Sequence, residues 1–276
     1  MPKIPIGATI EAFIDFLVTN FAFLTIAFTR IMENVIRVIE NGFLFLPPWL
    51  FILAATGLTF WLTRKRGIAL FTLLGLALIW NMGLWVPTIS TITLVLIATL
   101  TALSIAIPIG ILAALHNGIN RLVQPVLDVM QTMPAFVYLI PAIPFFGLGK
   151  VAAIFATVIF SMPPAIRLTC LGIKQVPREL VECADAFGST KWQKLFKLQL
   201  PLATPTIMAG VNQTVMLGLS MVVIAAMIGA RGLGGEVWRA IQRLQMGNGF
   251  EAGLGIVIVA IILDRVLQHF GTQSKR

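Results

Sequence analysis

Charged residues are scarce in this chain of 276 residues. Only 11% of its positions are Asp, Glu, Lys or Arg, whereas 58% are hydrophobic, and the mean hydropathy is +0.94. Because a soluble domain carries about 25% charged residues, this composition excludes an ordinary soluble domain and predicts one polytopic membrane domain. The net charge of +9 is therefore interpreted as a signal of membrane topology, and no nucleic-acid partner is expected.

The residues that most often carry metal or redox chemistry are also few, with two cysteines and two histidines. Cys170 is expected in a membrane segment and Cys183 in a cytoplasmic loop, so neither a disulfide nor a metal site is predicted, and no cofactor is expected in this chain. The chain also lacks the Gly-x-x-x-x-Gly-Lys-Ser/Thr loop of ATPases. Since no paired set of catalytic side chains stands out either, we predict that the chain is not an enzyme.

Long apolar runs are plentiful instead. A helix needs roughly 17–25 apolar residues to cross a bilayer, and seven runs qualify, with approximate ends: 46–63, 67–85, 88–115, 123–147, 150–172, 203–230 and 252–270. The fourth run contains four prolines, each of which removes an amide donor, so a kink or break is predicted there. Because broken backbone in a membrane must face protein or water, residues 131–147 are interpreted as either a cavity wall or a kinked packing helix.

The N-terminal 45 residues fit this scheme less well. Residues 13–28 are apolar but include Asp15 and Asn20, and residues 30–40 alternate charged with branched apolar side chains. We interpret 1–45 as an amphipathic helix lying on the bilayer, with an eighth span at about 10–29 as the alternative. The predicted organisation is an interfacial segment (1–45), two peripheral spans (46–87), a core (88–270) containing a cytoplasmic loop (173–202), and a cytoplasmic tail (271–276).

The most informative feature is the polar loop at 173–202, because a loop that only joined two spans could be a few residues long. Its first half carries apolar residues at helical spacing: Leu180, Val181, Ala184 and Phe187. Its second half repeats that pattern with Trp192, Leu195 and Phe196. Gly188 lies between the halves and predicts an elbow, since glycine adopts a left-handed conformation that other residues avoid. Pro177 is predicted to open the first helix, and Thr204–Pro205 to cap and open the next span.

The spacing within this loop resembles the EAA loop of ABC-importer permeases, which reads Glu-Ala-Ala, three residues, Gly, nine residues, Ile, one residue, Leu-Pro. The chain has Glu182-Cys183-Ala184, three residues, Gly188, nine residues and Leu198-Gln199-Leu200-Pro201. Cys183 replaces Ala and Leu198 replaces Ile, both modest apolar exchanges. Further segments are similar to permeases of glycine betaine/proline osmoprotectant importers: Gln131–Tyr138, Met162–Thr169, Leu171–Pro177, Ala209–Gln213 and Leu219–Ala230. The resemblance runs from about residue 67 to residue 264.

The resemblance implies an all-α polytopic membrane protein with the type I ABC-importer permease fold, with about seven transmembrane helices plus the N-terminal amphipathic helix. It implies a permease homodimer in the cell membrane, two ATPase subunits that bind ATP and Mg, and an extracytoplasmic substrate-binding protein. The implied cargo is a compatible solute, either glycine betaine, a related quaternary amine or proline. The implied ATPase-coupling residues are Glu182, Cys183, Ala184, Asp185, Ala186, Phe187, Gly188, Lys191 and Pro201.

Two further sets of residues are candidates on residue type alone. Polar and soft apolar side chains within the spans suit a weakly binding pathway: Met133, Tyr138, Asn212, Gln213, Met216 and Ser220. Interhelical hydrogen bonding is their alternative role, because buried amides in a membrane need partners. Beyond the sixth span, flexible glycines at 232–235 are expected to open a short outside helix. Its Trp238, Arg239 and Arg243 either contact the binding protein or belong to a helix that only seals the span ends.

Basic residues set the expected orientation. With the EAA-like loop inside, most Lys and Arg residues beyond the N-terminal region fall on the cytoplasmic side, as does the C-terminus, and the N-terminus falls outside. A secondary transporter of small osmolytes is the alternative function. The proline breaks fit that alternative, but the sparse buried charge does not.

Overall fold

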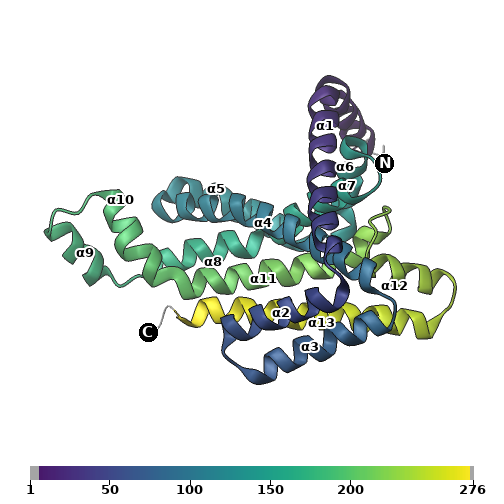
Figure 1. Ribbon diagram of the computed structural model, residues 1–276. Helices are drawn as coiled ribbons and strands as arrows, with labels where there is room; N and C mark the ends of the chain where they lie inside the picture. The colour runs from purple at the N-terminus through teal and green to yellow at the C-terminus, as the bar shows by residue number, and fades with distance from the viewer. Residues whose placement is uncertain (1–5, 274–276) are drawn as a thin grey trace.

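A computed structural model describes residues 6–273, which form helices joined by short turns, with no strand among them (Figure 1). The elements in chain order are α1 (Ile6–Phe45), α2 (Pro48–Thr63), α3 (Arg66–Asn81), α4 (Trp85–Leu115), α5 (Asn117–Thr132), η1 (Ala135–Tyr138), α6 (Leu139–Phe146), α7 (Lys150–Ser161), α8 (Pro163–Lys174), α9 (Arg178–Ala186), α10 (Lys191–Lys194), η2 (Leu195–Gln199), α11 (Leu200–Ala226), α12 (Leu233–Gln242) and α13 (Met246–Gln273). The all-α prediction is confirmed.

The main hydrophobic core is formed chiefly by α4, α7 and α11, and α8 packs between α4 and α11 beside it. Small residues allow this approach: a Cβ on Gly110 of α4 would lie 2.6 Å from Cβ of Thr169, and one on Gly210 of α11 would lie 3.0 Å from Cβ of Leu168. Close packing through small residues stabilises helices in a membrane, where lipid is as apolar as the side chains. Figure 1 shows α8, α11 and α13 running in a common direction, with α2 and α3 along one edge.

The number of spans differs from the prediction. Among the described residues, four helical stretches are long and apolar enough to cross a membrane: Gly7–Phe45, Trp85–Leu115, Lys150–Lys174 and Lys191–Ala226. A fifth is reached if the bent pair formed by α5 with η1 and α6 counts as one span. This criterion gives four or five spans within the described residues, one of them α1, which was not among the seven predicted runs. The run predicted at 252–270 lies in the 28-residue helix α13. Two of the predicted spans, α2 and α3, have only 16 residues each; at about 1.5 Å per residue such helices are shorter than the roughly 30 Å hydrocarbon core.

The break predicted from the prolines at 123–147 is present. The chain bends by 110° between α5 and the segment Ala135–Phe146. Pro134 lies at the bend with extended backbone (ψ 140°), and the Tyr138 hydroxyl donates a hydrogen bond back to the carbonyl oxygen of Met130. The Tyr138 ring packs edge-on against Phe160 of α7, with 5.8 Å between ring centroids. The break is thus packed against protein, as broken backbone at membrane depth requires.

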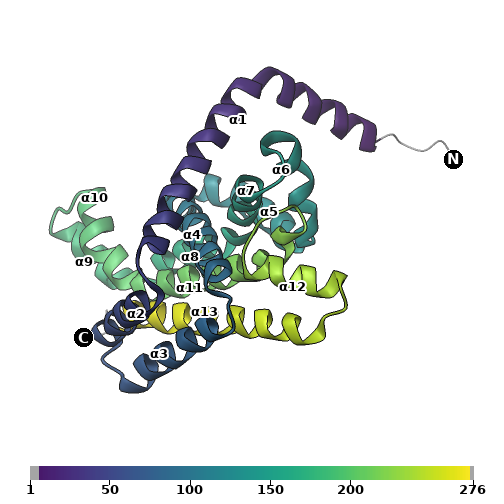
Figure 2. The ribbon, with the colours of Figure 1, turned by 45° about the vertical axis from the view of Figure 1, so that its right-hand side comes forward.

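The N-terminal region, predicted as an amphipathic helix on the bilayer with a span at about 10–29 as the alternative, forms one continuous helix, α1. The stretch Gly7–Phe45 is apolar enough to cross a membrane, and it exposes large side chains such as Phe13, Phe16 and Phe23. In Figure 1 it runs across the direction of α8 and α11, and Figure 2 shows that it bends. Its second half packs against α4, α6 and α7, where Lys150 Nζ lies 2.5 Å from Glu40 Oε1.

Candidate coupling loop and translocation surface

The first half of the polar loop is an exposed helix, α9, none of whose residues is buried. The helix begins at Arg178, so Pro177 occupies the capping position, one residue before the predicted first turn. Its apolar face has no partner in the single chain: Leu180 is 43% exposed, and Phe187, which caps the helix, is 86% exposed. Large apolar side chains gathered on a free helix indicate a contact surface for another protein.

The elbow after α9 has the left-handed backbone that glycine was predicted to supply. Gly188 has φ +70°, its amide donates to Asp185 O, and the next amide, of Ser189, donates to Ala184 O. Nothing lies within 4 Å of where a Cβ on Gly188 would stand. The requirement for glycine therefore comes from the backbone conformation and not from crowding within this chain.

The second half of the loop is joined directly to α11. Thr190 caps α10 in a reciprocal pair with Gln193, a Thr-x-x-Gln signature that was readable in the sequence but missed. From Lys191 the chain is helical to Ala226 for 36 residues, through the π-helical turn η2. The predicted helix start at Thr204–Pro205 is wrong: Thr204 Oγ1 donates to Leu200 O over 2.9 Å, and Pro205 lies inside α11.

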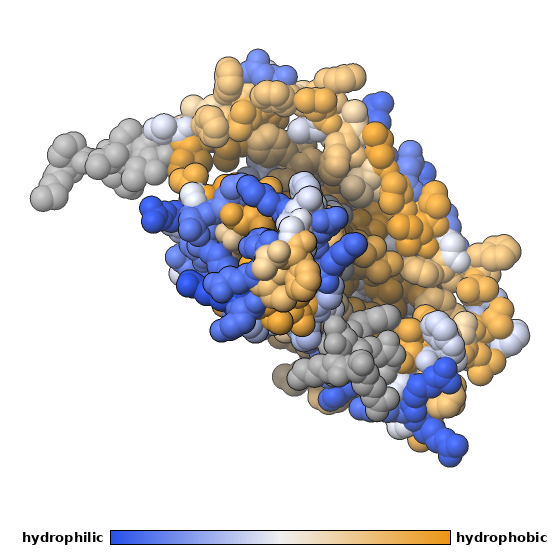
Figure 3. All heavy atoms as spheres, turned by 90° about the vertical axis from the view of Figure 1, so that its left-hand side faces the viewer, coloured by the Kyte–Doolittle hydropathy of each residue, from blue (hydrophilic) through white to orange (hydrophobic). Residues whose placement is uncertain are grey.

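An ion pair and an aromatic stack hold the loop together. Lys194 Nζ lies 2.6 and 2.8 Å from the two carboxylate oxygens of Asp185, which connects α10 to α9. The rings of Trp192 and Phe196 stack with centroids 5.9 Å apart, and both remain exposed. The other predicted coupling residues are exposed (Glu182, Cys183, Ala186, Lys191 and Pro201) or partly buried (Ala184). Viewed from this end, the part of the molecule nearest the viewer shows hydrophilic residues around a smaller hydrophobic area, whereas much of the surface behind it is hydrophobic (Figure 3).

The predicted pathway residues separate into two groups. Gln213, Met216 and Ser220 share an exposed face of α11, on which Leu202 and Ala209 also lie. Successive members of this set are three, four or seven residues apart, the spacing of a helical seam. Ser220 donates to the carbonyl oxygen of Met216 in its own helix and leaves this face polar. We call these five residues the α11 stripe.

The remaining pathway candidates point into the protein. Tyr138 is 4% exposed, and Met133, at the end of α5, is partly buried against the core. Asn212 Nδ2 donates over 2.9 Å to Asp264 Oδ1 of α13, the interhelical hydrogen bond that was its alternative role. Gln268, also in α13, donates to the same carboxylate. The hydrogen bond from Asn212 to Asp264 therefore connects α11 to α13.

One charged pair was not predicted as part of any site. Arg167 of α8 forms an ion pair with Asp128 of α5 through its terminal Nη2. The Asp128 side chain is 66% exposed and the Arg167 side chain 33%. The signal that could have identified the pair is the presence of ionisable residues inside apolar runs, which marks functional positions in membranes.

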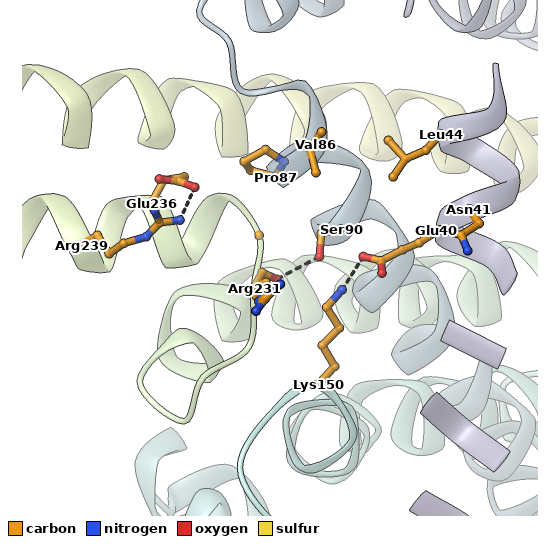
Figure 4. Close-up of a pocket in the computed structure, with 11 residues that line it drawn as sticks. Glu40, Asn41, Leu44, Val86, Pro87, Ser90, Lys150, Arg231, Glu236 and Arg239 are labelled. Atoms are coloured by element: carbon orange, nitrogen blue, oxygen red, sulfur yellow. Dashed lines mark hydrogen bonds and ion pairs between the residues drawn. The ribbon is translucent and has the colours of Figure 1, made fainter. Parts of the chain in front are cut away.

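The end of the molecule opposite the coupling loop carries a polar hollow of about 540 Å³, lined by residues of α1, α4, α7 and α12 (Figure 4). Lys150 points to Glu40, Ser90 donates to the carbonyl oxygen of Arg231, and Arg239 pairs with Glu236. The predicted outside helix is present as α12, with Trp238 partly buried and Arg243 exposed.

Gly232, just before α12, and Gly234, in its first turn, are closely packed, contrary to the flexibility predicted for them. Leu233 is fully buried and its amide donates to Thr91 Oγ1 over 2.8 Å. A Cβ on Gly234 would lie 2.4 Å from Val222 O, and one on Gly232 would lie 2.6 Å from Thr91 Oγ1. These glycines serve close packing of the segment onto α4 and α11, so α12 is held rigidly.

Comparison with known proteins identifies the family to which this architecture belongs. The family model of the inner membrane component of binding-protein-dependent transport systems matches residues 106–270. The chain belongs to this family. The matched region contains the coupling loop, the α11 stripe, the Asp128–Arg167 pair and α12, whereas α1, α2 and α3 lie outside it.

Two curated relatives align with this chain over its whole length. It is 51% identical to the glycine betaine/carnitine transport permease protein GbuB of Listeria monocytogenes, covering 100% of this chain and 98% of the relative. It is 49% identical to the glycine betaine transport system permease protein OpuAB of Bacillus subtilis, covering 100% and 97%. An inward-facing structure of the MetNI methionine ABC transporter has 22% identity and a TM-score of 0.59 over 69% of this chain and 93% of the other. The fold is therefore that of an ABC-importer permease.

Proposed function

We propose that this chain is the membrane-spanning subunit of an ATP-driven importer for glycine betaine or a related compatible solute. Two copies form one pathway, and each docks a separate ATPase subunit through residues 178–197. The observation that carries the proposal is the exposed surface of Phe187, Trp192 and Phe196 on a loop that is helically continuous with α11. The relatives named for glycine betaine transport support the choice of cargo.

The geometry supports a mechanical route from ATPase to pathway. ATP and Mg bind to the partner ATPases, whose closure brings the two docked loops together. Because α10, η2 and α11 form one helical stretch, displacement of the loop moves α11 and the α11 stripe with it. A π-helical turn in such a position is typical of functional sites. The rotation converts an inward-facing pathway to an outward-facing one, into which the binding protein releases its cargo.

In this arrangement the coupling loop and the C-terminus lie in the cytoplasm, and α12 and the polar hollow lie at the outer surface. The N-terminus lies outside, and the exposed apolar side chains of α1 contact lipid. The α11 stripe faces the second copy across the pathway, because its glutamine and serine are better placed against water or protein than against hydrocarbon.

The function is tested with the chain purified together with its ATPase and reconstituted in proteoliposomes with the binding protein. We expect uptake of radiolabelled glycine betaine that requires ATP and stops when the ATPase is inactivated. Carnitine, choline and proline in the same assay define the range of cargo. Uptake driven by a sodium or proton gradient without ATP would instead establish the secondary transporter.

Cysteine accessibility is expected to separate the α11 stripe from the inward-pointing residues. Cysteines replacing Gln213, Met216 or Ser220 should react with a water-soluble thiol reagent, and the reaction rate should change when nucleotide closes the ATPases. A cysteine at Asn212, which bonds to Asp264, should react at least about tenfold more slowly, because the site is packed between helices. Equal and nucleotide-independent rates at all four positions would remove the stripe from the pathway.

Charge reversal on α12 is expected to weaken the encounter with the binding protein. Exposed Arg239 and Arg243 carry positive charge at the outer end, although Arg239 also pairs with Glu236. Changing both to Glu should raise the binding-protein concentration for half-maximal ATPase stimulation by roughly three- to tenfold at low ionic strength, and less at high salt, because surface charges steer association and are screened. If the concentration is unchanged at low salt, α12 only seals the span ends.

A further inference from the structure

The Asp128–Arg167 pair lies at membrane depth. The apolar stretch Lys150–Lys174 is 25 residues long, and Arg167 is seven residues before its cytoplasmic end, which corresponds to about 10 Å along a helix. Asp128 belongs to α5, so the pair joins α5 to α8. Both charges therefore lie inside the layer that the apolar spans occupy, not in the loops that connect them.

The surroundings of the pair exclude a lipid-facing position. Asp128 is 66% exposed in the single chain, and a carboxylate at that depth is strongly disfavoured against hydrocarbon. It must therefore face water or protein that the single chain lacks. Ionisable groups in such positions face a bundle interior or a water-filled cavity and mark substrate pathways.

The packing of α8 shows which helices adjoin the pair. On α8, Leu168 contacts Gly210 of α11, Thr169 contacts Gly110 of α4, and Cys170 Sγ lies 3.5 Å from Asn120 Oδ1 of α5. Arg167 extends past these contacts to Asp128 of α5. Figure 1 shows α8 between α5 and α11, the helices that carry Asp128 and the α11 stripe.

Arg167 has unused capacity for an anion. Its pair with Asp128 uses Nη2, whereas its buried Nε has no hydrogen-bond partner within the described residues. A guanidinium binds a carboxylate best through two parallel N–H donors. Because Nε is buried while the side chain as a whole is 33% exposed, a second carboxylate would reach the guanidinium at its terminal nitrogens, where it competes with Asp128.

From these observations we propose that Asp128 and Arg167 form a subsite for a small zwitterion in the translocation pathway. The carboxylate of the cargo accepts hydrogen bonds from Arg167, and its quaternary ammonium, which has no N–H, lies against the Asp128 carboxylate by charge alone. When the site is empty, the two side chains neutralise each other. Binding of the cargo replaces the Asp128–Arg167 ion pair with one contact to each side chain. The loss of the first pair offsets part of the gain, so binding stays weak, as a pathway requires. The inference rests on the proposed function and specifies the cargo chemistry that this chain itself recognises.

The test uses the reconstituted complex with Asp128→Asn, Arg167→Gln and the double variant. We expect each to lower glycine betaine uptake per ATP hydrolysed by about tenfold, while ATPase stimulation by the binding protein stays within about twofold, since only interactions with the moving cargo are lost. A purely structural pair predicts something else: the single variants are impaired, but the double variant recovers because neither charge is left unpaired. Recovery of uptake in the double variant would overturn the proposal.

A second measurement does not depend on transport. Gln131→Cys, at an exposed position one helical turn after Asp128 in α5, leaves both charges in place. It should react with a charged thiol reagent in the nucleotide-free complex, and glycine betaine should slow that reaction whereas sorbitol at the same osmolality should not. Mass spectrometry of each cysteine-containing peptide separates this site from Cys183, which is also exposed. Absence of protection by glycine betaine would again contradict the subsite, even if the single variants fail to assemble with the ATPase.

The matched control is the ion pair between α1 and α7, Glu40 with Lys150. Neutralising both with Gln removes a comparable contact at the outer end and should leave uptake per ATP unchanged. If the unmodified complex carries no glycine betaine at all, the proposed function fails. If it carries glycine betaine and the Asp128 and Arg167 variants behave as the control does, only the subsite fails.

Discussion

Replacing Gly188 with arginine is expected to abolish ATP-driven uptake while the protein still folds and inserts in the membrane. Gly188 has φ +70° and open space around it, so arginine costs only about 1–2 kcal/mol of backbone strain. The long charged side chain projects from the exposed elbow beside Phe187, at the surface on which we propose that the ATPase docks. We expect uptake to fall by at least about 100-fold, because a buried, unpaired charge at an interface costs several kcal/mol.

The matched variant is Gly188→Asn, because asparagine tolerates the left-handed conformation and is short. It should retain most of the uptake and should copurify with the ATPase. Gly188→Arg should reach the membrane in a normal amount but lose the ATPase on purification. Normal copurification and uptake by the arginine variant would show that the elbow does not contact the ATPase.

Replacing Gly234 with alanine is expected to destabilise the junction between α11 and α12. The new Cβ would lie 2.4 Å from Val222 O and 2.8 Å from Val222 C, and backbone atoms in a packed helix cannot move aside at low cost. Overpacking of this kind costs roughly 1–3 kcal/mol. We therefore expect a lower melting temperature of the purified protein and reduced stimulation by the binding protein, since α12 is displaced.

Gly235→Ala provides the control in the next position. The atom nearest to its Cβ would be Ala230 O at 3.5 Å, an ordinary contact, and alanine favours a helix over glycine by about 1 kcal/mol. Its melting temperature should equal or exceed that of the unmodified protein. If Gly234→Ala melts at the same temperature as Gly235→Ala, the first turn of α12 is flexible after all.

The sequence was sufficient to predict the structural class, the family and the positions where the backbone must break or turn. Scarce charge and long apolar runs determined a helical membrane protein, because hydrocarbon forces every backbone group into internal hydrogen bonds. The prolines at 123–147 determined a break, and Gly188 an elbow, because each restricts the backbone locally. The Glu182–Pro201 spacing was enough to indicate the family that the match over 106–270 shows.

Tertiary structure decided which side chains meet. The apparent helix start at Thr204–Pro205 was overridden because α10 and η2 run on into α11. Gly232 and Gly234 at the start of α12 looked flexible, yet contacts with Thr91 and Val222, each more than ten residues away in the sequence, require them. Asp128 and Arg167 are 39 residues apart, and no local pattern relates them. Conformational preferences act within a few residues, whereas pairing, burial and exposure depend on helices that the fold brings together.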